Sequence, residues 1–256
     1  MLIVAGSEIK PDAVAGQQQL SDTERKVLDA MSSAENTFRY GTQDELLFEL
    51  GMRKNIISAS NELYRARMRF RTFRESECNP KFWDRTPEGG FALKEGVRPS
   101  QAIQDIFENG RKYGTECATA IVIVFYKAVL DMYKPELFDR TFQDIYLMNW
   151  QHANKNLGVA TYRNPDGYFP GDCRYFANPD VNPLTPEWQG ENAIDLGNGE
   201  YYGHGIGIMD ADGIIRALNM NRIHGSDVSA HLLETATRPD FKNLYKKYVA
   251  AGDLLE

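Results

Sequence analysis

A cysteine at the start of a long apolar segment is the strongest candidate for a nucleophile in this sequence. Cys117 follows Glu116 and opens the run 116–132, which is apolar almost throughout. A thiol in the first turn of a helix lies near unsatisfied backbone N–H groups and the positive end of the helix dipole, which lower its pKa. The same N–H groups can stabilise an acyl oxyanion. The alternative is a small buried hydrophobe, the commoner role of a lone cysteine in such a segment.

A nucleophilic thiol needs a proton acceptor, and the second half of the chain supplies two candidates, Glu191 and His204. Asn198-Gly199, between two apolar runs, is typical of a two-residue hairpin loop. With that loop, Ala193 faces His204, and Glu191 lies two residues further along on the same face, so both side chains converge on one thiol. A register shift of one residue would place them on opposite faces. Taken singly, a bonded sheet histidine and a solvated carboxylate are the commoner interpretations.

The remaining cysteines and histidines do not form a recognisable metal site. The three cysteines are widely spaced with no Cys-x-x-Cys pair, so neither a disulfide framework nor a zinc knuckle is predicted. Cys173 lies in a predicted strand and is interpreted as a packing residue. The other histidines are scattered, and the sequence has no EF-hand, Walker or Gly-x-Gly-x-x-Gly motif. We expect no metal and no cofactor.

Length and composition indicate a single globular domain over residues 1–256. Of these residues, 42% are hydrophobic and 25% charged, as in an ordinary soluble protein, which excludes disorder, fibres and coiled coils. The longest apolar stretch, residues 118–126, is about half the ~18 residues that a membrane-spanning helix needs. The apolar N-terminus has no basic segment before it, so we expect an intracellular protein that is not secreted.

The charge of the chain argues against nucleic acid as a partner. Lys and Arg number 29 and Asp and Glu 36, giving a net charge of −7, whereas nucleic-acid-binding domains are usually basic. Residues 65–74 do interleave arginines with aromatic residues, as an RNA-stacking surface does. Because this patch is isolated in an acidic chain, we interpret it as a solvated helix end.

The first half of the chain, about residues 1–135, has the pattern of helices. Residues 21–24 and 42–45 are both capping boxes, each followed by apolar residues at helical spacing. Another helix is predicted to start after Pro99-Ser100 and to end at Asn109-Gly110. The run 116–132 contains β-branched residues, but its length favours a helix over a strand.

Strands predominate from about residue 136 to 215. Strand-like runs occupy 144–150, 173–176, 192–196 and 201–209, and residues 210–213 resemble a turn. Two C-terminal helices are predicted within about 224–250, one capped by Ser226 and running toward Thr235, the other following Pro239. Helices, then mostly antiparallel strands, then helices predict an α+β fold.

Several ordered motifs along nearly the whole chain resemble the spore transglutaminases of bacilli. The resemblance runs from residue 2 to residue 238. The motifs are Glu-Asn-Gly at 108–110, Tyr-Gly-Thr-Glu-Cys-Ala-Thr-Ala-Ile-Val-Ile at 113–123, Gly-Asp-Cys-x-Tyr-Phe-x-Asn-Pro at 171–179, Trp-x-Gly-Glu-Asn at 188–192 and His-Gly-x-Gly-Ile at 204–208. Motifs in this order over such a span are far more specific than any single one.

The resemblance implies a papain-like, NlpC/P60-type core in which a nucleophile helix packs on a mostly antiparallel sheet, flanked by additional helices. It implies a calcium-independent protein-glutamine γ-glutamyltransferase. Its partners would be glutamine- and lysine-bearing spore coat proteins, joined by ε-(γ-glutamyl)lysine bonds on the developing spore. We further expect a monomer, with neither nucleic acid nor a membrane as partner.

Carried over residue by residue, the resemblance assigns the nucleophile to Cys117 and the principal catalytic glutamate to Glu191. Glu116 corresponds to a partial substitute for that glutamate, and His204 to a strand histidine of the family. The predicted chemistry is a two-step acyl transfer, in which the thiolate attacks a glutamine carboxamide and ammonia leaves. Glu191 would act first as acid and then as base, which favours a carboxyl whose pKa is raised by an apolar setting.

Aromatic residues are predicted to form the substrate site. Trp150 and Trp188 match tryptophans that line the substrate passage in the family, and Phe70 and Tyr175 are further candidates. Such side chains exclude water from a thioester. Asn149 departs from the family, whose members often carry aspartate there, and residues 161–170 and 246–256 match it poorly.

Two alternatives stay open. A cysteine peptidase or amidase of the NlpC/P60 kind would use Cys117 and His204 to cleave an amide, with water taking the acyl group. A coat scaffold that kept the fold would have no catalytic activity at all.

Overall fold

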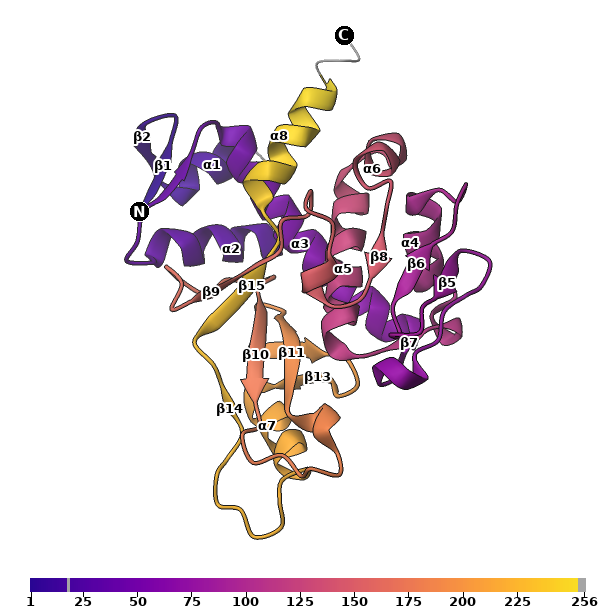
Figure 1. The fold of residues 1–256 in the computed structure, drawn as a ribbon. Helices are drawn as coiled ribbons and strands as arrows, with labels where there is room; N and C mark the ends of the chain where they lie inside the picture. The colour runs from indigo at the N-terminus through magenta and orange to yellow at the C-terminus, as the bar shows by residue number, and fades with distance from the viewer. Residues whose placement is uncertain (18, 253–256) are drawn as a thin grey trace.

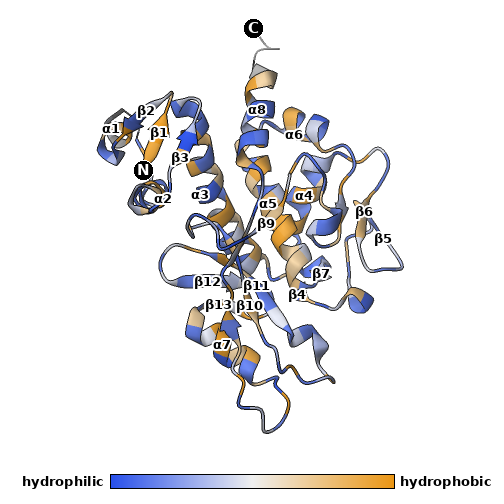
Figure 2. Ribbon diagram, turned by 60° about the vertical axis from the view of Figure 1, so that its left-hand side comes forward, coloured by the Kyte–Doolittle hydropathy of each residue, from blue (hydrophilic) through white to orange (hydrophobic). Residues whose placement is uncertain are grey.

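Two long helices lie side by side at the centre of the molecule, α3 (Gln43–Ala66) and α5 (Cys117–Met132) (Figure 1). The structure is a computed structural model that describes residues 1–17 and 19–252; residue 18 and residues 253–256, the end of the predicted C-terminal tail, lie outside it. All residues of α5 from Ala118 to Val129 are buried, and α5 is mostly orange in Figure 2. Within the described ranges, no helix is long and apolar enough to cross a membrane.

The helices predicted in the first half are confirmed. Helix α2 (Asp22–Ser33) starts with a complete capping box between Ser21 and Glu24. Helix α3 has its cap at Thr42, but the Glu45 carboxylate accepts from the Gly41 N–H instead of the Thr42 N–H. The remaining helices of this half are α1 (Pro11–Gln17) and α4 (Pro99–Glu108), followed by α6 (Pro135–Thr141).

Short strands, which the sequence analysis missed, interrupt this helical half. They are β1 (Leu2–Val4), β2 (Ser7–Ile9), β3 (Phe38–Tyr40), β4 (Arg69–Phe70), β5 (Trp83–Arg85), β6 (Phe91–Leu93) and β7 (Gly114–Thr115). Only two or three residues long, they are too short for a period-2 pattern to be recognised. The predicted strand over 144–150 is wrong in extent, because only β8 (Tyr146–Leu147) forms, and the 3₁₀ helix η3 (Trp150–His152) follows it.

The main sheet is antiparallel, as predicted, with strand order β13-β12-β11-β10-β15-β9 and β14 beside β10. Its strands are β9 (Ala160–Arg163), β10 (Cys173–Ala177), β11 (Gly190–Asp195), β12 (Glu200–Gly203), β13 (Gly207–Asp210), β14 (His231–Leu232) and β15 (Thr235–Arg238). On β11, Ile194 packs into the core built around α3 and α5, whereas Ala193 packs with α7 (Ala211–Asn219). Strands β11 and β12 thus lie between the central helices and α7 (Figure 1).

The predicted hairpin register is wrong by one residue. Ala193 pairs with Gly203, not with His204, because the loop has three residues, 197–199, instead of two. Gly197 and Gly199 adopt positive φ, 77° and 85°, whereas a two-residue Asn-Gly loop would place positive φ at Asn198 and Gly199. The predicted strand over 201–209 is likewise two strands, β12 and β13, joined by a turn at 204–206 in which Gly205 has φ 103°.

The C-terminal region also corrects the prediction. Asp210 accepts a hydrogen bond from the Gly213 N–H and so caps α7, where a turn was expected. The helix predicted from Ser226 toward Thr235 is absent from this described segment, since the Ser226 hydroxyl bonds to Asp180 and to the Val228 N–H, and the chain continues as β14 and β15. The helix after Pro239 is confirmed as α8 (Phe241–Gly252).

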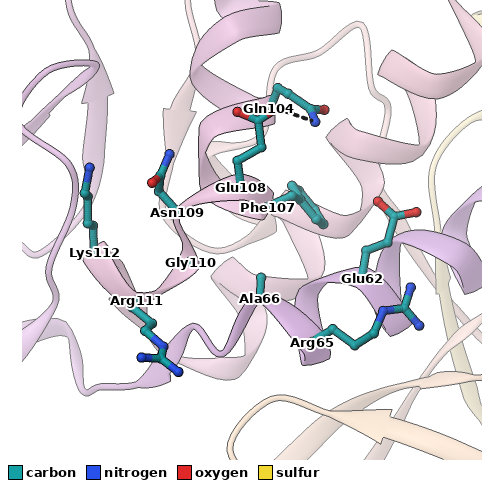
Figure 3. A pocket seen from close by; sticks show the side chains of 10 residues that line it. All are labelled: Glu62, Arg65, Ala66, Gln104, Phe107, Glu108, Asn109, Gly110, Arg111 and Lys112. Atoms are coloured by element: carbon teal, nitrogen blue, oxygen red, sulfur yellow. Dashed lines mark hydrogen bonds between the residues drawn. The ribbon is translucent and has the colours of Figure 1, made fainter.

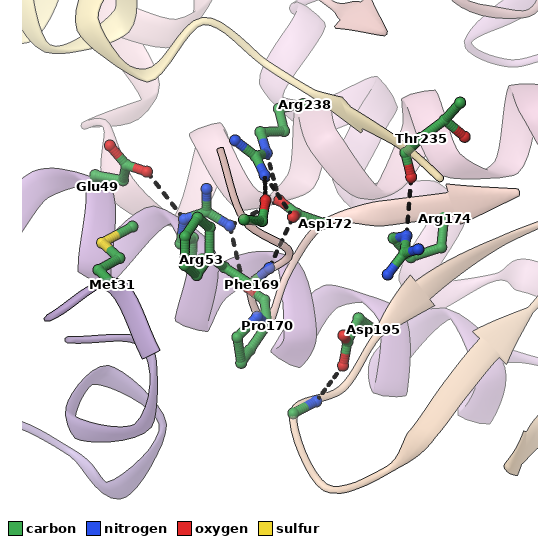
Figure 4. A network of polar contacts seen from close by, with 12 residues as sticks. Met31, Glu49, Arg53, Phe169, Pro170, Asp172, Arg174, Asp195, Thr235 and Arg238 are labelled. Atoms are coloured by element: carbon green, nitrogen blue, oxygen red, sulfur yellow. Dashed lines mark hydrogen bonds and ion pairs between the residues drawn. The ribbon is translucent and has the colours of Figure 1, made fainter. Parts of the chain in front are cut away.

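A buried ionic network anchors the start of β10 to α3 (Figure 4). The carboxylate of Asp172, the residue before Cys173, accepts hydrogen bonds from Arg53 at 2.8 Å and from Arg238 at 2.6 and 2.8 Å. Arg53 also donates to Glu49 at 3.0 Å. Burial alone would raise the pKa of Asp172, but the two guanidinium groups and these hydrogen bonds outweigh it and lower the pKa.

Asp172→Asn should lower the free energy of unfolding by about 3–5 kcal/mol, because it removes the buried carboxylate that Arg53 and Arg238 share. The lowered pKa of Asp172 adds a pH signature. Its contribution is complete above the unfolded pKa of about 3.9 and is lost as the pH falls through the lower folded value. The difference in unfolding free energy between wild type and variant, measured with urea, should therefore be smaller at pH 3 than at pH 7. A matched control is Asp84→Asn, which breaks an exposed pair with Lys94 and should cost only a small fraction of that amount; equal losses would contradict the network's role.

Candidate active site

Cys117 is the first residue of α5, as predicted, and Glu116 is the N-cap. The Glu116 carboxylate accepts hydrogen bonds from the Ala118 N–H at 2.6 Å and the Thr119 N–H at 2.7 Å, and a third from the Thr119 hydroxyl. Glu116 therefore caps the helix whose first turn carries the thiol. Two of the first-turn N–H groups that we expected to be free for the thiol or for an oxyanion, those of Ala118 and Thr119, are thus already bonded to this carboxylate.

The predicted lowering of the thiol pKa is wrong in direction. Burial raises the pKa of Cys117 well above its ordinary value, and the negative charges of Glu191 and Glu116 raise it further. Hydrogen bonds from Asn192 oppose this rise. Burial and the charges of the two glutamates, Glu191 more than Glu116, therefore outweigh the stabilisation that a helix N-terminus gives to a thiolate.

Glu191 lies in β11 with only 4% of its surface exposed, and its Oε1 atom has no hydrogen-bond partner among the described residues. Burial is the main cause that raises the pKa of Glu191, the Glu116 charge adds to it, and the His204 backbone N–H opposes it. The glycine at 203 makes room for this carboxyl, since a Cβ there would lie 2.9 Å from the Glu191 side chain. The raised pKa agrees with what an acid and base for acyl transfer requires.

Asn192, the residue after Glu191, touches the thiol directly, a role that the sequence analysis did not assign. Its Nδ2 donates a hydrogen bond to Cys117 Sγ at 3.3 Å. Asn192 shares the sheet face of Ile194, which packs in the core around α5, so alternation along β11 places its amide beside the nucleophile helix. The alternation of side chains along β11 could have indicated this contact, but the incorrectly predicted hairpin register singled out Glu191 and His204 instead.

The imidazole of His204 has two hydrogen-bond partners, and neither is the thiol. Its Nε2 lies 3.2 Å from the Arg69 carbonyl oxygen and its Nδ1 3.2 Å from the Tyr202 hydroxyl. A carbonyl only accepts, so Nε2 carries the proton and Nδ1 accepts from Tyr202. Burial lowers the pKa of His204 to about 4, so the ring is neutral at pH 7. His204 thereby ties the turn after β12 to β4.

A cavity of about 430 Å³ opens beside Cys117. Phe70, Tyr175 and Asn192 are among the residues that line it, together with Cys117 itself. The predicted tryptophans are not in its lining, although each neighbours a residue that is. Trp150 follows the lining residue Asn149, while Trp188 lies between Glu187 and Gln189 with its ring centroid 6.4 Å from that of Phe70.

A separate cavity of about 530 Å³ lies between the end of α3 and α4 (Figure 3). Charged side chains of both signs line it, among them Glu62, Arg65 and Lys112, and it contains none of the predicted site residues. All three cysteines of the chain are free. Across residues 1–17 and 19–252, no group of three or more His, Cys, Asp or Glu side chains is placed to hold a metal ion.

Thr119 links the nucleophile helix to the loop before Trp150. Its hydroxyl, buried with the residue at 1% exposure, donates to Glu116 and accepts from the Asn149 N–H at 3.0 Å. Thr119→Val keeps the shape and removes both bonds, so we expect a loss of about 1.5–3 kcal/mol in the free energy of unfolding, measured with urea. Thr119→Ser should restore most of it, because serine keeps the hydroxyl. If Thr119→Val were as stable as wild type, the two hydrogen bonds would make no net contribution to the free energy of unfolding.

The fold and this site together define a cysteine acyl-transfer protein. A helix presents a thiol at its N-terminus, an antiparallel sheet packs against that helix, and the sheet carries a buried carboxyl whose charge acts on the thiol. A thiol with an adjacent acid or base is the arrangement that covalent acyl transfer uses.

Comparison with known proteins narrows the class. The chain belongs to the family of protein-glutamine gamma-glutamyltransferases, which it matches over residues 1–248. Proteins of that name from Bacillus mycoides (strain KBAB4) and Bacillus cereus (strain AH820) are each 44% identical over 240 residues, covering 94% of this chain and 86% of theirs. A solved structure, the transglutaminase from Geobacillus stearothermophilus without its C-terminal extension, is 48% identical with a TM-score of 0.78, over 81% of this chain and 99% of that one.

These similarities confirm the predicted family, the α+β fold and the enzyme class. The protein is a transglutaminase, which cross-links glutamine- and lysine-bearing proteins.

Proposed function

We propose that Cys117 is the nucleophile of this transglutaminase and that Glu191 is its acid and base. The observation that carries the proposal is the buried Glu191 carboxyl, whose charge acts on the Cys117 thiol and whose Oε1 atom has no hydrogen-bond partner in the part of the chain that the structure describes. A buried carboxyl oxygen without a partner costs free energy. Such a group is typical of a site whose proton is transferred during the reaction.

In the first half-reaction, Cys117 and Glu191 hold one proton between them. With the proton on Glu191, the thiolate attacks the carbonyl carbon of a glutamine carboxamide, and the C=O electron pair moves to oxygen. When that pair returns, the C–N bond breaks, and the Glu191 proton goes to nitrogen. Ammonia leaves, the acyl group stays on sulfur as a thioester, and Glu191 becomes a carboxylate.

In the second half-reaction, a lysine amine attacks the thioester carbon, and the C–S bond breaks. The Glu191 carboxylate takes a proton from the attacking nitrogen. This step restores the thiolate and the protonated carboxyl and leaves an isopeptide bond. The raised pKa of Glu191 suits both directions of transfer, because a carboxyl that titrates closer to neutrality is both a usable acid and a usable base.

The neighbouring residues have supporting roles. Glu116 caps α5 and keeps a negative charge near the pair, which supports a partial catalytic contribution. His204, with both ring nitrogens already bonded, acts as a positioning residue that holds β4 against the turn after β12. In a Cys-His dyad of the hydrolase kind, one of these two ring nitrogens would have to bond to the thiol instead.

The aromatic residues form the substrate site in this proposal. Phe70 and Tyr175 line the cavity and contact the glutamine side chain, and Trp188 extends this surface beside Phe70. Trp150 extends it on the other side, next to Asn149. Apolar walls here exclude water, which would otherwise hydrolyse the thioester.

The proposed substrates are spore coat proteins, and the proposed site of action is the surface of the developing spore inside the producing cell. The resemblance to spore transglutaminases supports this, and a net charge of −7 is compatible with lysine-bearing partners. The same resemblance supports activity without calcium and without any cofactor.

The test uses the full-length protein, reduced, with a glutamine-bearing protein and a labelled primary amine. We expect covalent amine incorporation, read by mass spectrometry, at the same rate in a chelator and in millimolar calcium. Deamidated or cleaved substrate without incorporated amine would replace the transferase by a hydrolase. A calcium requirement would overturn the calcium-independent mechanism.

A further inference from the structure

Two backbone donors in the first turn of α5 are already bonded, although the chemistry needs donors beside the thiol. When sulfur attacks a carbonyl carbon, negative charge develops on the carbonyl oxygen, and enzymes stabilise it with preorganised N–H groups. At many helix N-termini the first backbone N–H groups do this. Here the N–H groups of Ala118 and Thr119 are bonded to the Glu116 carboxylate.

The side-chain amide of Asn192 is placed to supply a donor of this kind. Its Nδ2 lies 3.3 Å from Cys117 Sγ, and this sulfur is its one hydrogen-bond partner in the described part of the chain. An amide nitrogen carries two protons, so one remains for another acceptor. Asn192 is 7% exposed and lines the cavity beside Cys117, so its remaining exposure is toward the space where an acyl group must sit.

We propose that Asn192 is a catalytic residue whose Nδ2 amide donates a hydrogen bond to the oxyanion of the tetrahedral intermediate. The carbonyl oxygen is two bonds from the sulfur in that intermediate, which brings it within reach of a donor 3.3 Å from the same sulfur. As the C–S bond forms, the C=O pair moves to the oxygen and the second Nδ2 proton bonds to it. When the pair returns and ammonia leaves, the bond weakens. The proposal rests on Cys117 being the nucleophile.

A competing explanation is that Asn192 only stabilises the thiolate. The two roles separate in a pair of reactions at Cys117. Alkylation by iodoacetamide reports the thiolate and forms no oxyanion, whereas acylation by p-nitrophenyl acetate forms one and releases nitrophenolate. Alkylation of Cys117 in the full-length protein is measured by mass spectrometry of the labelled peptide, and acylation by nitrophenolate absorbance. Both rates are measured across a pH series that reaches the plateau of the alkylation rate.

Two variants remove the donor in different ways. Asn192→Ala leaves space, and Asn192→Leu keeps nearly the same shape. For both, we expect plateau alkylation within about 3-fold of wild type, acylation by the ester at least ~10-fold slower, and incorporation of amine into a glutamine protein slower by about 10²–10³-fold. If alkylation and acylation fell by the same factor, or if neither changed, the oxyanion role would be overturned.

Asn55→Ala is the matched control, because Asn55 Nδ2 also donates to α5, at the Ala128 carbonyl oxygen 3.3 Å away. Ala128 lies about 16 Å along the helix from Cys117, so this variant loses an amide bond to α5 but should leave the ratio of the two rates unchanged. The ester assay needs no glutamine substrate. A wild type that incorporates no amine would therefore refute the proposed function alone, while the rate ratio still decides the role of Asn192.

Discussion

Cys117→Ala should abolish amine incorporation, lowering kcat by about 10⁵–10⁶-fold, the range lost when a covalent nucleophile is removed. Alanine cannot form the thioester, so no acyl group can be held for a lysine. The fold should tolerate the change, because Cys117 is the first residue of α5 and alanine is a good helix former. The measurement is the initial rate of labelled amine incorporation, with thermal unfolding to show that the variant is folded.

Cys78→Ala is the control for a general effect of losing a thiol. Cys78 is partly exposed, its sulfur contacts the Trp83 carbonyl oxygen, and it is not in the lining of the cavity. We expect its activity to equal that of wild type. Incorporation that persists in Cys117→Ala but disappears in Cys78→Ala would assign the nucleophile to a thiol outside the cavity lining and contradict the mechanism.

The position of the nucleophile could be predicted because it depends on local sequence. The run 116–132 is too long for a strand and almost wholly apolar, which requires a buried helix, and Glu116 and Cys117 stand where that helix must begin. Antiparallel pairing around Asn198-Gly199 was predictable for the same reason. Both inferences use residues within one or two elements.

The hairpin register and the pKa of the thiol could not be predicted, because each depends on how several residues are arranged relative to one another. Gly197 adds one residue to the hairpin loop and shifts every pair of β11 and β12. The thiol pKa depends on whether the Glu116 carboxylate folds back on the helix and on how deeply Glu191 is buried, and neither follows from spacing. The contact between Asn192 and the sulfur required the true register.

Glu191→Gln should lower kcat for amine incorporation by about 10²–10⁴-fold, the contribution of a well-placed general acid and base. Glutamine keeps the size of the side chain but can neither protonate the leaving ammonia nor take a proton from the lysine nitrogen. The pH profile should change form as well. In wild type, the pair must hold one proton, so activity falls both when the pair gains a second proton and when it loses the last. In the variant only the thiol titrates, so its residual activity should rise with pH and then level off.

Alkylation of the Cys117 thiol should become faster in Glu191→Gln at pH 7, whereas acyl transfer becomes slower. The Glu191 charge is one of the causes that raise the pKa of Cys117, so Glu191→Gln should lower that pKa and shift the alkylation of Cys117 by iodoacetamide to lower pH. At pH 7 the variant should therefore alkylate faster than wild type while transferring acyl groups far more slowly. A damaged fold does not produce that combination, because disorder in the site slows transfer without preserving a titration that shifts in a defined direction.

The matched control is Glu200→Gln, the same change at an exposed carboxylate of the neighbouring strand β12. Glu200 accepts from the Asn198 side chain in the hairpin loop and lies away from the cavity lining, so transfer rate, pH profile and alkylation should all match wild type. If Glu191→Gln kept the bell-shaped profile, another group would hold the proton, and Glu116 is the carboxylate to test next, since its charge acts on both Cys117 and Glu191. The double variant Glu116→Gln/Glu191→Gln should then no longer show the fall in activity at high pH that the single variant kept.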